Sequence, residues 1–332
     1  MHDVYYTTAG GPWFNSGADI WVTEWLKEVA PNLEVKPLLL FHRKRPENYD
    51  EFQIDIDHIW TTSENEIIDI FNSARKIHIL HGHYTPTRGV HQNLEKINSI
   101  VFHNLTKVSL IAQQQKEEYL HWYGNYEYEN EMIDKIKNKV WIGLYNFPYQ
   151  TENLYQIPNC YEFKNNKKLS NSTTIGYAAR VEGRKNVEFL DGLKSYICTN
   201  TEAFKNYYVK KYGYKFENSR LYKFDYKHKD KFYNLDWGVS HSCFDNEPFG
   251  YGIFEAVDYG KLPILNENWY SPLDYKYKAK DTKSFKEIYN QICEDDYETK
   301  KNEFEKLKSW MINNFSNKEV WKEKLLDIYN GE

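Results

Sequence analysis

The stretch Glu247-Pro-Phe-Gly-Tyr-Gly-Ile-Phe-Glu255 carries two carboxylates eight positions apart, with a glycine-bearing turn between them. We predict that a strand ends before Glu247 and that a helix begins at about Tyr251. Glu255 then lies about one turn inside that helix. The backbone N–H groups of Phe249, Gly250 and Tyr251 fall at the helix N-terminus, which attracts anions. The stretch therefore offers two hydroxyl acceptors on either side of an anion site, the combination that a nucleoside diphosphate sugar requires.

The pattern resembles the Glu-x7-Glu signature of retaining glycosyltransferases with the two-domain GT-B fold, in particular family 4. In that family the first Glu contacts the donor sugar hydroxyls and the second holds the nucleotide ribose. The resemblance implies these roles for Glu247 and Glu255. Two Glu at this spacing also occur by chance in a long chain, but Phe-Gly after the first and Gly260-Lys-Leu-Pro263 after the second favour the family.

The composition sets limits on the class of protein. The chain has 332 residues, 41% of them hydrophobic and 17% aromatic, which is enough for two domains with sizeable cores. A net charge of −5 argues against coating nucleic acid by global charge, although a local basic groove is compatible with it. No apolar run approaches the ~20 residues that span a bilayer. We expect a soluble, cytoplasmic protein, in the host cytoplasm if a phage encodes it, with four reduced cysteines, Cys160, Cys198, Cys243 and Cys293.

Strands and helices alternate in the hydrophobic pattern of both halves. In the first half we predict strands at 3–8, 35–41, 57–61, 76–80, 99–103 and 107–111, and helices at 18–30 and 63–74. In the second half we predict strands at 173–179, 221–224, 237–244 and 262–266, and helices at 185–197 and 318–329. Such alternation favours parallel sheets covered on both faces.

The resemblance implies an α/β protein of the GT-B architecture, with two Rossmann-like domains whose parallel sheets face across a cleft. We predict an N-terminal acceptor domain at 1–150 and a C-terminal nucleotide-sugar donor domain at 170–315. The C-terminal helix, at about 316–332, is expected to cross back to the first domain.

A basic loop follows the first predicted strand of the second half. Gly176-Tyr-Ala-Ala-Arg180-Val-Glu-Gly-Arg-Lys185-Asn186 resembles the family's Gly-Arg-x(3–5)-Lys-Gly/Asn element, in which an Arg and a Lys neutralise the leaving diphosphate. The resemblance implies this role for Arg180 and Lys185, and Arg184 competes with Lys185 as the second cation. Fixed cations stabilise the charge that grows on a leaving phosphate. The alternative is a solvated basic turn.

Loops of the first half carry further candidates. Gly10 and Gly11 follow the first strand, where glycine lets the backbone approach a phosphate, although they also fit a plain turn. In His81-Gly-His83 we favour His83, which the resemblance places near the donor sugar or the reacting carbon. A metal-binding pair would need further ligands at suitable spacing. Arg88 is a weaker candidate for binding phosphate or acceptor.

Asp55-Ile-Asp57 matches the Asp-x-Asp metal motif of the other large glycosyltransferase fold. The alternating apolar and polar residues around it favour a half-buried strand instead. GT-B enzymes generally need no bound metal, so we expect no metal and no cofactor beside the donor substrate.

The acceptor is the least determined part. His81-Gly-His83, Tyr145-Asn-Phe147 and Gly260-Lys-Leu-Pro263 resemble short motifs of bacteriophage DNA glycosyltransferases, which modify 5-hydroxymethylcytosine. The resemblance implies double-stranded DNA as partner, and the mixed aromatic and basic runs at 207–215 and 222–229 suit it. A Lys-rich surface explains these runs equally. A lipid-linked or cell-surface saccharide is the competing acceptor, and a non-catalytic sugar-nucleotide-binding protein is the rival class.

Overall fold

The computed structural model describes residues 3–7, 17–34, 37–41, 57–60, 76–81, 99–103, 141–143, 154–156, 159–181, 183–224, 229–245, 247 and 249–330. The chain divides into two units by its internal contacts. The first unit is Met1–Asn159 together with Lys318–Glu332, and the second is Cys160–Asn317.

The first unit contains a five-stranded parallel sheet in the order β3-β2-β1-β4-β5. The strands are β1 (Asp3–Thr7), β2 (Pro37–Phe41), β3 (Asp57–Trp60), β4 (Lys76–His81) and β5 (Ser99–His103). The predictions of these five strands are confirmed to within two residues. Strands β6 (Trp141–Gly143) and β7 (Leu154–Gln156) form a separate parallel pair. In the five-stranded sheet the strand order reverses between β1 and β4, so the β1–β4 pair is its topological switch point.

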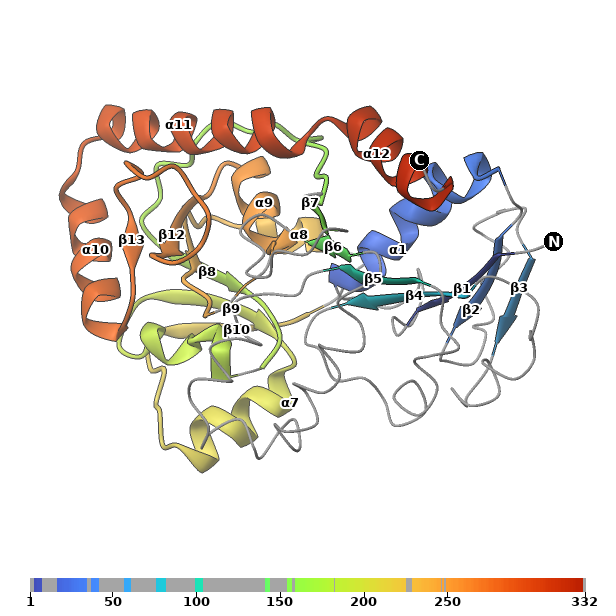
Figure 1. Ribbon diagram of the computed structural model, residues 1–332. Helices are drawn as coiled ribbons and strands as arrows, with labels where there is room; N and C mark the ends of the chain where they lie inside the picture. The colour runs from blue at the N-terminus through green and yellow to red at the C-terminus, as the bar shows by residue number, and fades with distance from the viewer. Residues whose placement is uncertain are drawn as a thin grey trace. The chain divides into compact units, whose positions relative to one another are not determined.

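The two predicted helices at the ends of the chain pack against each other within the first unit. They are α1 (Gly17–Glu28) and α12 (Lys318–Asn330). The Lys318 ammonium lies 2.7 Å from the carboxylates of both Glu24 and Glu28. The indole rings of Trp21 and Trp321 meet edge to face at 6.4 Å between centroids. Figure 1 shows the red α12 beside the blue α1.

The second unit contains a six-stranded parallel sheet in the order β10-β9-β8-β11-β12-β13. The strands are β8 (Ile175–Ala178), β9 (Ser195–Thr199), β10 (Ser219–Lys223), β11 (Val239–Ser242), β12 (Leu262–Asn266) and β13 (Lys278–Ala279). The chain moves outward from β8 through β9 to β10, returns to β11, and then moves outward the other way (Figure 1). The switch point of this sheet is therefore the β8–β11 pair.

The helices of the second unit follow its strands. They are α7 (Thr201–Phe204) with a π-helix (Lys205–Lys211), α8 (Lys229–Tyr233), α9 (Tyr251–Asp258), α10 (Thr282–Glu294) and α11 (Tyr297–Phe315). A core of aromatic rings joins α9 to α11: Phe249 stacks on Phe254 at 4.3 Å, and Phe315 meets Phe254 edge-on at 5.5 Å. This packing fixes the start of α9, which is where the two carboxylates of the opening stretch lie.

The predicted helix at 185–197 is wrong. The structure has short 3-10 turns at Gly183–Lys185 and Val187–Leu190, followed by the buried strand β9. Asn186 has a left-handed backbone at φ 51° and Gly192 has φ 83°, and neither conformation continues an α-helix. The residues of β9 include the β-branched Ile197 and Thr199 and the aromatic Tyr196, which favour an extended backbone.

Candidate active site

The loops that follow β8 and β11 meet at the carboxyl ends of these neighbouring strands. Three hydrogen bonds join them. The Asn186 side-chain amide donates to the Cys243 carbonyl at 3.0 Å, the Asp245 N–H donates to the Arg184 carbonyl at 2.8 Å, and the His241 ring lies 2.8 Å from the Asn186 carbonyl. The basic loop is therefore fixed against β11 by its backbone, at the edge of the sheet where ligands of open α/β proteins bind.

Glu247 lies among the cations of this loop. Its carboxylate forms a hydrogen-bonded ion pair with the Lys185 ammonium, and the Arg184 guanidinium lies 3.6 Å away. The side chains of Glu247 and Lys185 are 12% and 10% exposed, so solvent screens the pair weakly. Burial by itself raises the pKa of Glu247, but the charges of Lys185, Arg184 and Arg180 outweigh it and the pKa is lowered. Both Lys185 and its competitor Arg184 thus adjoin the same carboxylate.

Arg180 lies two positions after the end of β8 and is exposed. Its backbone carbonyl accepts a hydrogen bond of 3.1 Å from the buried Tyr177 hydroxyl. The preceding residue is held as well, because the Thr199 hydroxyl donates to the Ala179 carbonyl at 2.7 Å. The exit of β8 is therefore fixed while the guanidinium reaches solvent.

The turn between the two carboxylates requires glycine. Gly250 has φ 78°, and a Cβ there would lie 2.9 Å from side-chain atoms of both Glu247 and Ile253. Helix α9 begins at the next residue, Tyr251, as predicted. A Cβ at Gly252 would lie 3.8 Å from the Ala178 carbonyl oxygen, so the first turn of α9 faces the end of β8. The helix N-terminus, where backbone N–H groups attract anions, therefore adjoins the basic loop.

Glu255, in the second turn of α9, is held by helix α8. Lys229 forms an ion pair with its Oε1 atom, and the Tyr233 hydroxyl donates to Oε2 at 3.4 Å. Burial, then the charge of Glu255, raise the pKa of Tyr233 well above its usual range. The Tyr233 phenol consequently stays protonated and serves as a donor.

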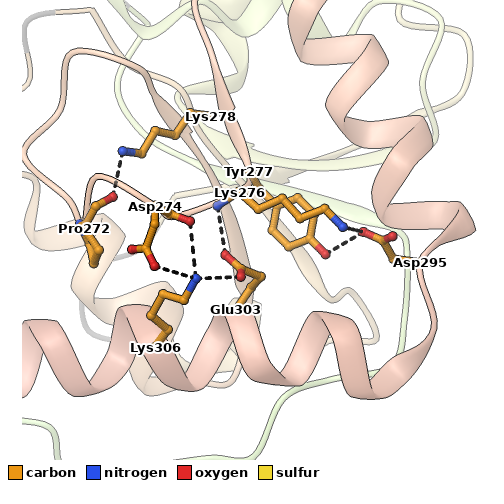
Figure 2. A network of polar contacts seen from close by, with 8 residues as sticks. All are labelled: Pro272, Asp274, Lys276, Tyr277, Lys278, Asp295, Glu303 and Lys306. Atoms are coloured by element: carbon orange, nitrogen blue, oxygen red, sulfur yellow. Dashed lines mark hydrogen bonds and ion pairs between the residues drawn. The ribbon is translucent and has the colours of Figure 1, made fainter.

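The loop between β12 and β13 is anchored near Glu247 by contacts with helix α11 and by a hydrogen bond of 3.3 Å from the Trp269 ring N–H to the Phe249 carbonyl. It carries Tyr270, whose pKa is raised by burial and by the charge of Glu247. Figure 2 shows how the loop is held: Lys306 of α11 binds the Asp274 carboxylate at 3.2 Å and Glu303 at 2.8 Å. Glu303 also accepts the Lys276 N–H at 2.8 Å. Helix α11 thus holds a loop whose Tyr270 lies within reach of the charge of Glu247, a neighbour that the sequence did not indicate.

Among the described residues, Arg180, Arg184 and Lys185 lie near Glu247, and Lys229 forms an ion pair with Glu255. This concentration of cations suits an anionic ligand such as a diphosphate. Within the ranges given above, no three or more His, Cys, Asp or Glu side chains gather into a group that could hold a metal ion.

Several predicted site residues fall outside the described part of the chain. They are Gly10, Gly11, His83 and Arg88. The first two follow β1 in the sequence, and His83 follows β4, which ends at His81. Of the Asp-x-Asp motif, Asp57 begins β3, whereas Asp55 lies outside the described residues.

Sequence reasoning missed the partners of Glu255. Lys229 ends the aromatic and basic run at 222–229, which suits DNA or a Lys-rich surface equally, and no sequence motif singles out Tyr233. Lys229 is separated from Glu255 by 26 positions, so only its spacing of four from Tyr233 on a short helix signals a shared target.

Comparisons by sequence and by structure gave different results. No family model matches the chain, and no curated protein matches it in sequence. Solved structures do match along nearly the whole chain. HepE from Anabaena, solved in complex with UDP and glucose, matches with a TM-score of 0.71 at 11% identity, covering 100% of both chains. Sucrose-phosphate synthase from Thermosynechococcus elongatus matches with a TM-score of 0.70 at 12% identity, covering 99% of this chain and 98% of the other.

A third match is an α-glucosyltransferase solved in complex with UDP, with a TM-score of 0.59 at 11% identity and 99% coverage of both chains. These structures have the GT-B fold, so the predicted fold class is confirmed: the chain is an α/β protein with two Rossmann-like units. In the part of the chain that the structure describes, no helix is both long and apolar enough to cross a membrane.

Proposed function

We propose that the protein is a retaining glycosyltransferase that moves a sugar from a UDP-linked donor to a hydroxyl group. One observation carries the proposal. Glu247 lies against Lys185 and Arg184 at the switch point of a GT-B sheet, so an acceptor for sugar hydroxyls and a cluster for the diphosphate occupy one place. The structural matches that contain UDP support the choice of nucleotide.

The proposed roles follow from charge. Arg180, Lys185 and Arg184 bind the diphosphate, together with the N-terminus of α9 formed by Phe249, Gly250 and Tyr251. Glu247 accepts hydrogen bonds from the sugar, and Glu255 accepts them from the ribose. We also propose that Gly10 and Gly11 contact the phosphates, that His83 contacts the sugar, and that Arg88 contacts phosphate or the acceptor. The second unit is the donor domain and the first is the acceptor domain.

The reaction we propose is a front-side displacement. The bond between the anomeric carbon and the phosphate oxygen breaks, and the nucleoside diphosphate leaves with the electron pair. The acceptor oxygen bonds to the same face of the anomeric carbon, and its proton passes to the departing phosphate oxygen. No covalent intermediate is needed, because fixed cations stabilise the leaving group while binding orients both substrates.

Donor use is tested by measuring UDP binding and the slow hydrolysis of UDP-sugars by the purified protein. We expect UDP to bind and Glu247→Gln to lower hydrolysis by about tenfold or more. Glu287→Gln is the matched control, because Glu287 is an exposed carboxylate on α10, 3.8 Å from Lys283. Equal hydrolysis by the two variants contradicts the site assignment. Donor binding without hydrolysis or transfer to any acceptor indicates a non-catalytic binding protein.

We further propose that the acceptor is 5-hydroxymethylcytosine in double-stranded DNA. The supporting feature is an aromatic and basic surface on the π-helix. Lys211 lies over the rings of Tyr207 and Tyr212, at 5.2 and 5.0 Å, and Tyr212 is 52% exposed. A Cβ at Gly183 would lie 3.6 Å from the Tyr207 hydroxyl, so this surface adjoins the basic loop. Exposed aromatic rings beside cations suit an extruded base and its phosphates.

The acceptor is tested by mass spectrometry of hydroxymethylated DNA after incubation with a panel of nucleotide sugars. We expect a mass increase of one sugar with one of the donors, and weaker DNA binding when Lys211 and Tyr212 are both changed to Ala. The exposed pair Lys283 and Lys301, changed to Ala, provides the control. An unchanged DNA mass across the panel, with transfer to a lipid-linked or cell-surface saccharide, would reject DNA as the acceptor.

A further inference from the structure

The carboxylate of Glu255 is held from one side by two residues of α8. Lys229 and Tyr233 are four positions apart on this helix, so both side chains project from the same face. Lys229 binds Oε1 and Tyr233 donates to Oε2, so each carboxylate oxygen has a donor. The Glu255 side chain is 14% exposed and that of Lys229 is 30% exposed.

The support behind these two donors is rigid. The ring of Tyr233 stacks on the ring of Tyr259, with 5.0 Å between centroids and an interplanar angle of 23°. Tyr233 also packs 5.7 Å from the Trp237 ring. Because Tyr233 is buried, its hydroxyl cannot turn to water, and its position relative to Glu255 is set by the core of the second unit.

The geometry leaves capacity for a ligand. An ionised carboxylate has about four acceptor positions, of which Lys229 and Tyr233 occupy two. The remaining positions suit a pair of adjacent hydroxyls. Lys229 also offsets the charge of Glu255, which would otherwise repel the diphosphate of a bound nucleotide.

We propose that Lys229, assisted by Tyr233, is a positioning residue for nucleotide specificity. The two side chains aim the Glu255 carboxylate at the 2′- and 3′-hydroxyls of the donor's ribose, and the site thereby selects ribonucleotides over 2′-deoxyribonucleotides. This inference rests on the proposed function, in which Glu255 holds the ribose.

The test compares the dissociation constants of UDP and 2′-deoxy-UDP by calorimetry. We expect the wild-type protein to favour UDP by about tenfold or more, because a charged acceptor loses one hydrogen bond with the deoxy ligand. Lys229→Met should reduce the ratio of the dissociation constants of 2′-deoxy-UDP and UDP to the value found for Glu255→Gln, and Tyr233→Phe should reduce it in part. Lys229→Arg, which keeps the positive charge, should keep most of this ratio. Lys283→Met, an exposed lysine on α10, should leave it unchanged.

A double variant separates positioning from a general loss of charge. In the Glu255→Gln background, Lys229→Met should change the UDP preference no further. If Lys229→Met weakens the binding of UDP and 2′-deoxy-UDP equally, so that the ratio of their dissociation constants is unchanged, Lys229 acts only as a charge and the inference is overturned. The inference is also overturned if Glu255→Gln removes the preference for UDP while Lys229→Met keeps it. In that case the proposed function still stands.

A wild-type protein that binds UDP without preferring it to 2′-deoxy-UDP overturns the ribose role of Glu255 itself, and with it both proposals for this residue. Thermal unfolding of each variant shows whether it is folded. If Lys229→Met does not fold, Tyr233→Phe and Lys229→Arg carry the test, since both keep the packing of α8.

Discussion

The imidazole of His241 and the backbone carbonyl of Asn186 lie 2.8 Å apart, and this contact joins strand β11 to the loop that carries Lys185. The other ring nitrogen of His241 accepts the Cys243 N–H at 3.4 Å. Nε2 therefore carries the proton and the ring is neutral. Burial, opposed by the hydrogen bond to Asn186 and aided by the charge of Lys185, lowers the pKa of His241 to about 4.

This shift predicts a loss of stability in mild acid. Between pH 6.5 and about 4 the unfolded chain binds a proton at His241 that the folded chain does not, so the free energy of unfolding falls as pH falls. The loss should reach roughly 3 kcal/mol at the low end. The pKa of Glu247 is lowered, so the stability that its charge contributes is lost as the pH falls from the usual range of a carboxyl down through that lowered value, which adds to the loss only at the acid end of this window. Urea unfolding at a series of pH values measures the effect.

The control for this prediction is His241→Gln, which keeps a neutral donor for the Asn186 carbonyl and removes the titration. The stability of this variant should depend less on pH than that of the wild-type protein over the same window. Equal slopes for the two proteins would show that another group titrates there.

Gly250→Ala should disturb both stability and donor binding. Its φ of 78° costs about 1–2 kcal/mol with a side chain, and the added Cβ collides with Glu247 and Ile253. Gly213→Ala is the matched control, because Gly213 has φ 74° and open space around its Cβ position. Chemical denaturation should show a larger loss for Gly250→Ala, and calorimetry should show weaker UDP binding only for that variant. Similar UDP affinities would separate this turn from the donor site.

Arg180→Ala should slow turnover. If the guanidinium stabilises the leaving phosphate, its loss raises the barrier by ~2–4 kcal/mol, a decrease in kcat of roughly 10²–10³. Steady-state release of UDP measures this directly. Arg220→Ala removes an exposed arginine from β10 and should leave kcat unchanged. A wild-type rate for Arg180→Ala would remove this residue from the proposed mechanism.

Breaking the buried ion pair from one side should destabilise the protein. Lys185→Met leaves Glu247 with Arg184 and Arg180 as its remaining cations, and Glu247→Gln leaves Lys185 facing Arg184. Each single variant should lose roughly 3 kcal/mol, whereas the double variant should lose less than the sum, because it leaves neither charge unpaired. Urea unfolding of the wild-type protein, the two single variants and the double variant measures the free energy by which the two side chains are coupled. Additive losses would mean that the two side chains do not stabilise each other.

Lys318→Ala should loosen helix α12 from α1. The ammonium separates Glu24 and Glu28, whose charges lie one helical turn apart, so its removal leaves them repelling each other. We expect a loss of about 1 kcal/mol that shrinks with added salt. Lys322→Ala is the comparison, since Lys322 lies 3.8 Å from the largely exposed Glu319 of its own helix. Equal effects of the two variants contradict a specific role for Lys318.

Much of the fold could be predicted because local patterns and tertiary packing agree. Continuous apolar runs such as 37–41 and 262–266 are parallel strands in the structure, and the second of them is buried along its whole length. The prediction failed at 185–197, where helical spacing of apolar residues is overridden by the left-handed backbone of Asn186 and by Gly192. The π-helix at Lys205–Lys211 has no reliable sequence signal, because its bonding pattern reflects the packing of Phe204, Tyr208 and Phe216.

The candidate site divides in the same way. The spacing of Glu247 and Glu255 around a glycine turn, and the basic loop after β8, are local features that the sequence alone determined, because one turn and one strand end position each of them. Which charges meet was decided by the tertiary structure. Lys185 reaches Glu247 only because β8 and β11 are neighbours, and Lys229 reaches Glu255 only because α8 packs against α9. Such pairings join residues 62 and 26 positions apart, and no local pattern encodes them.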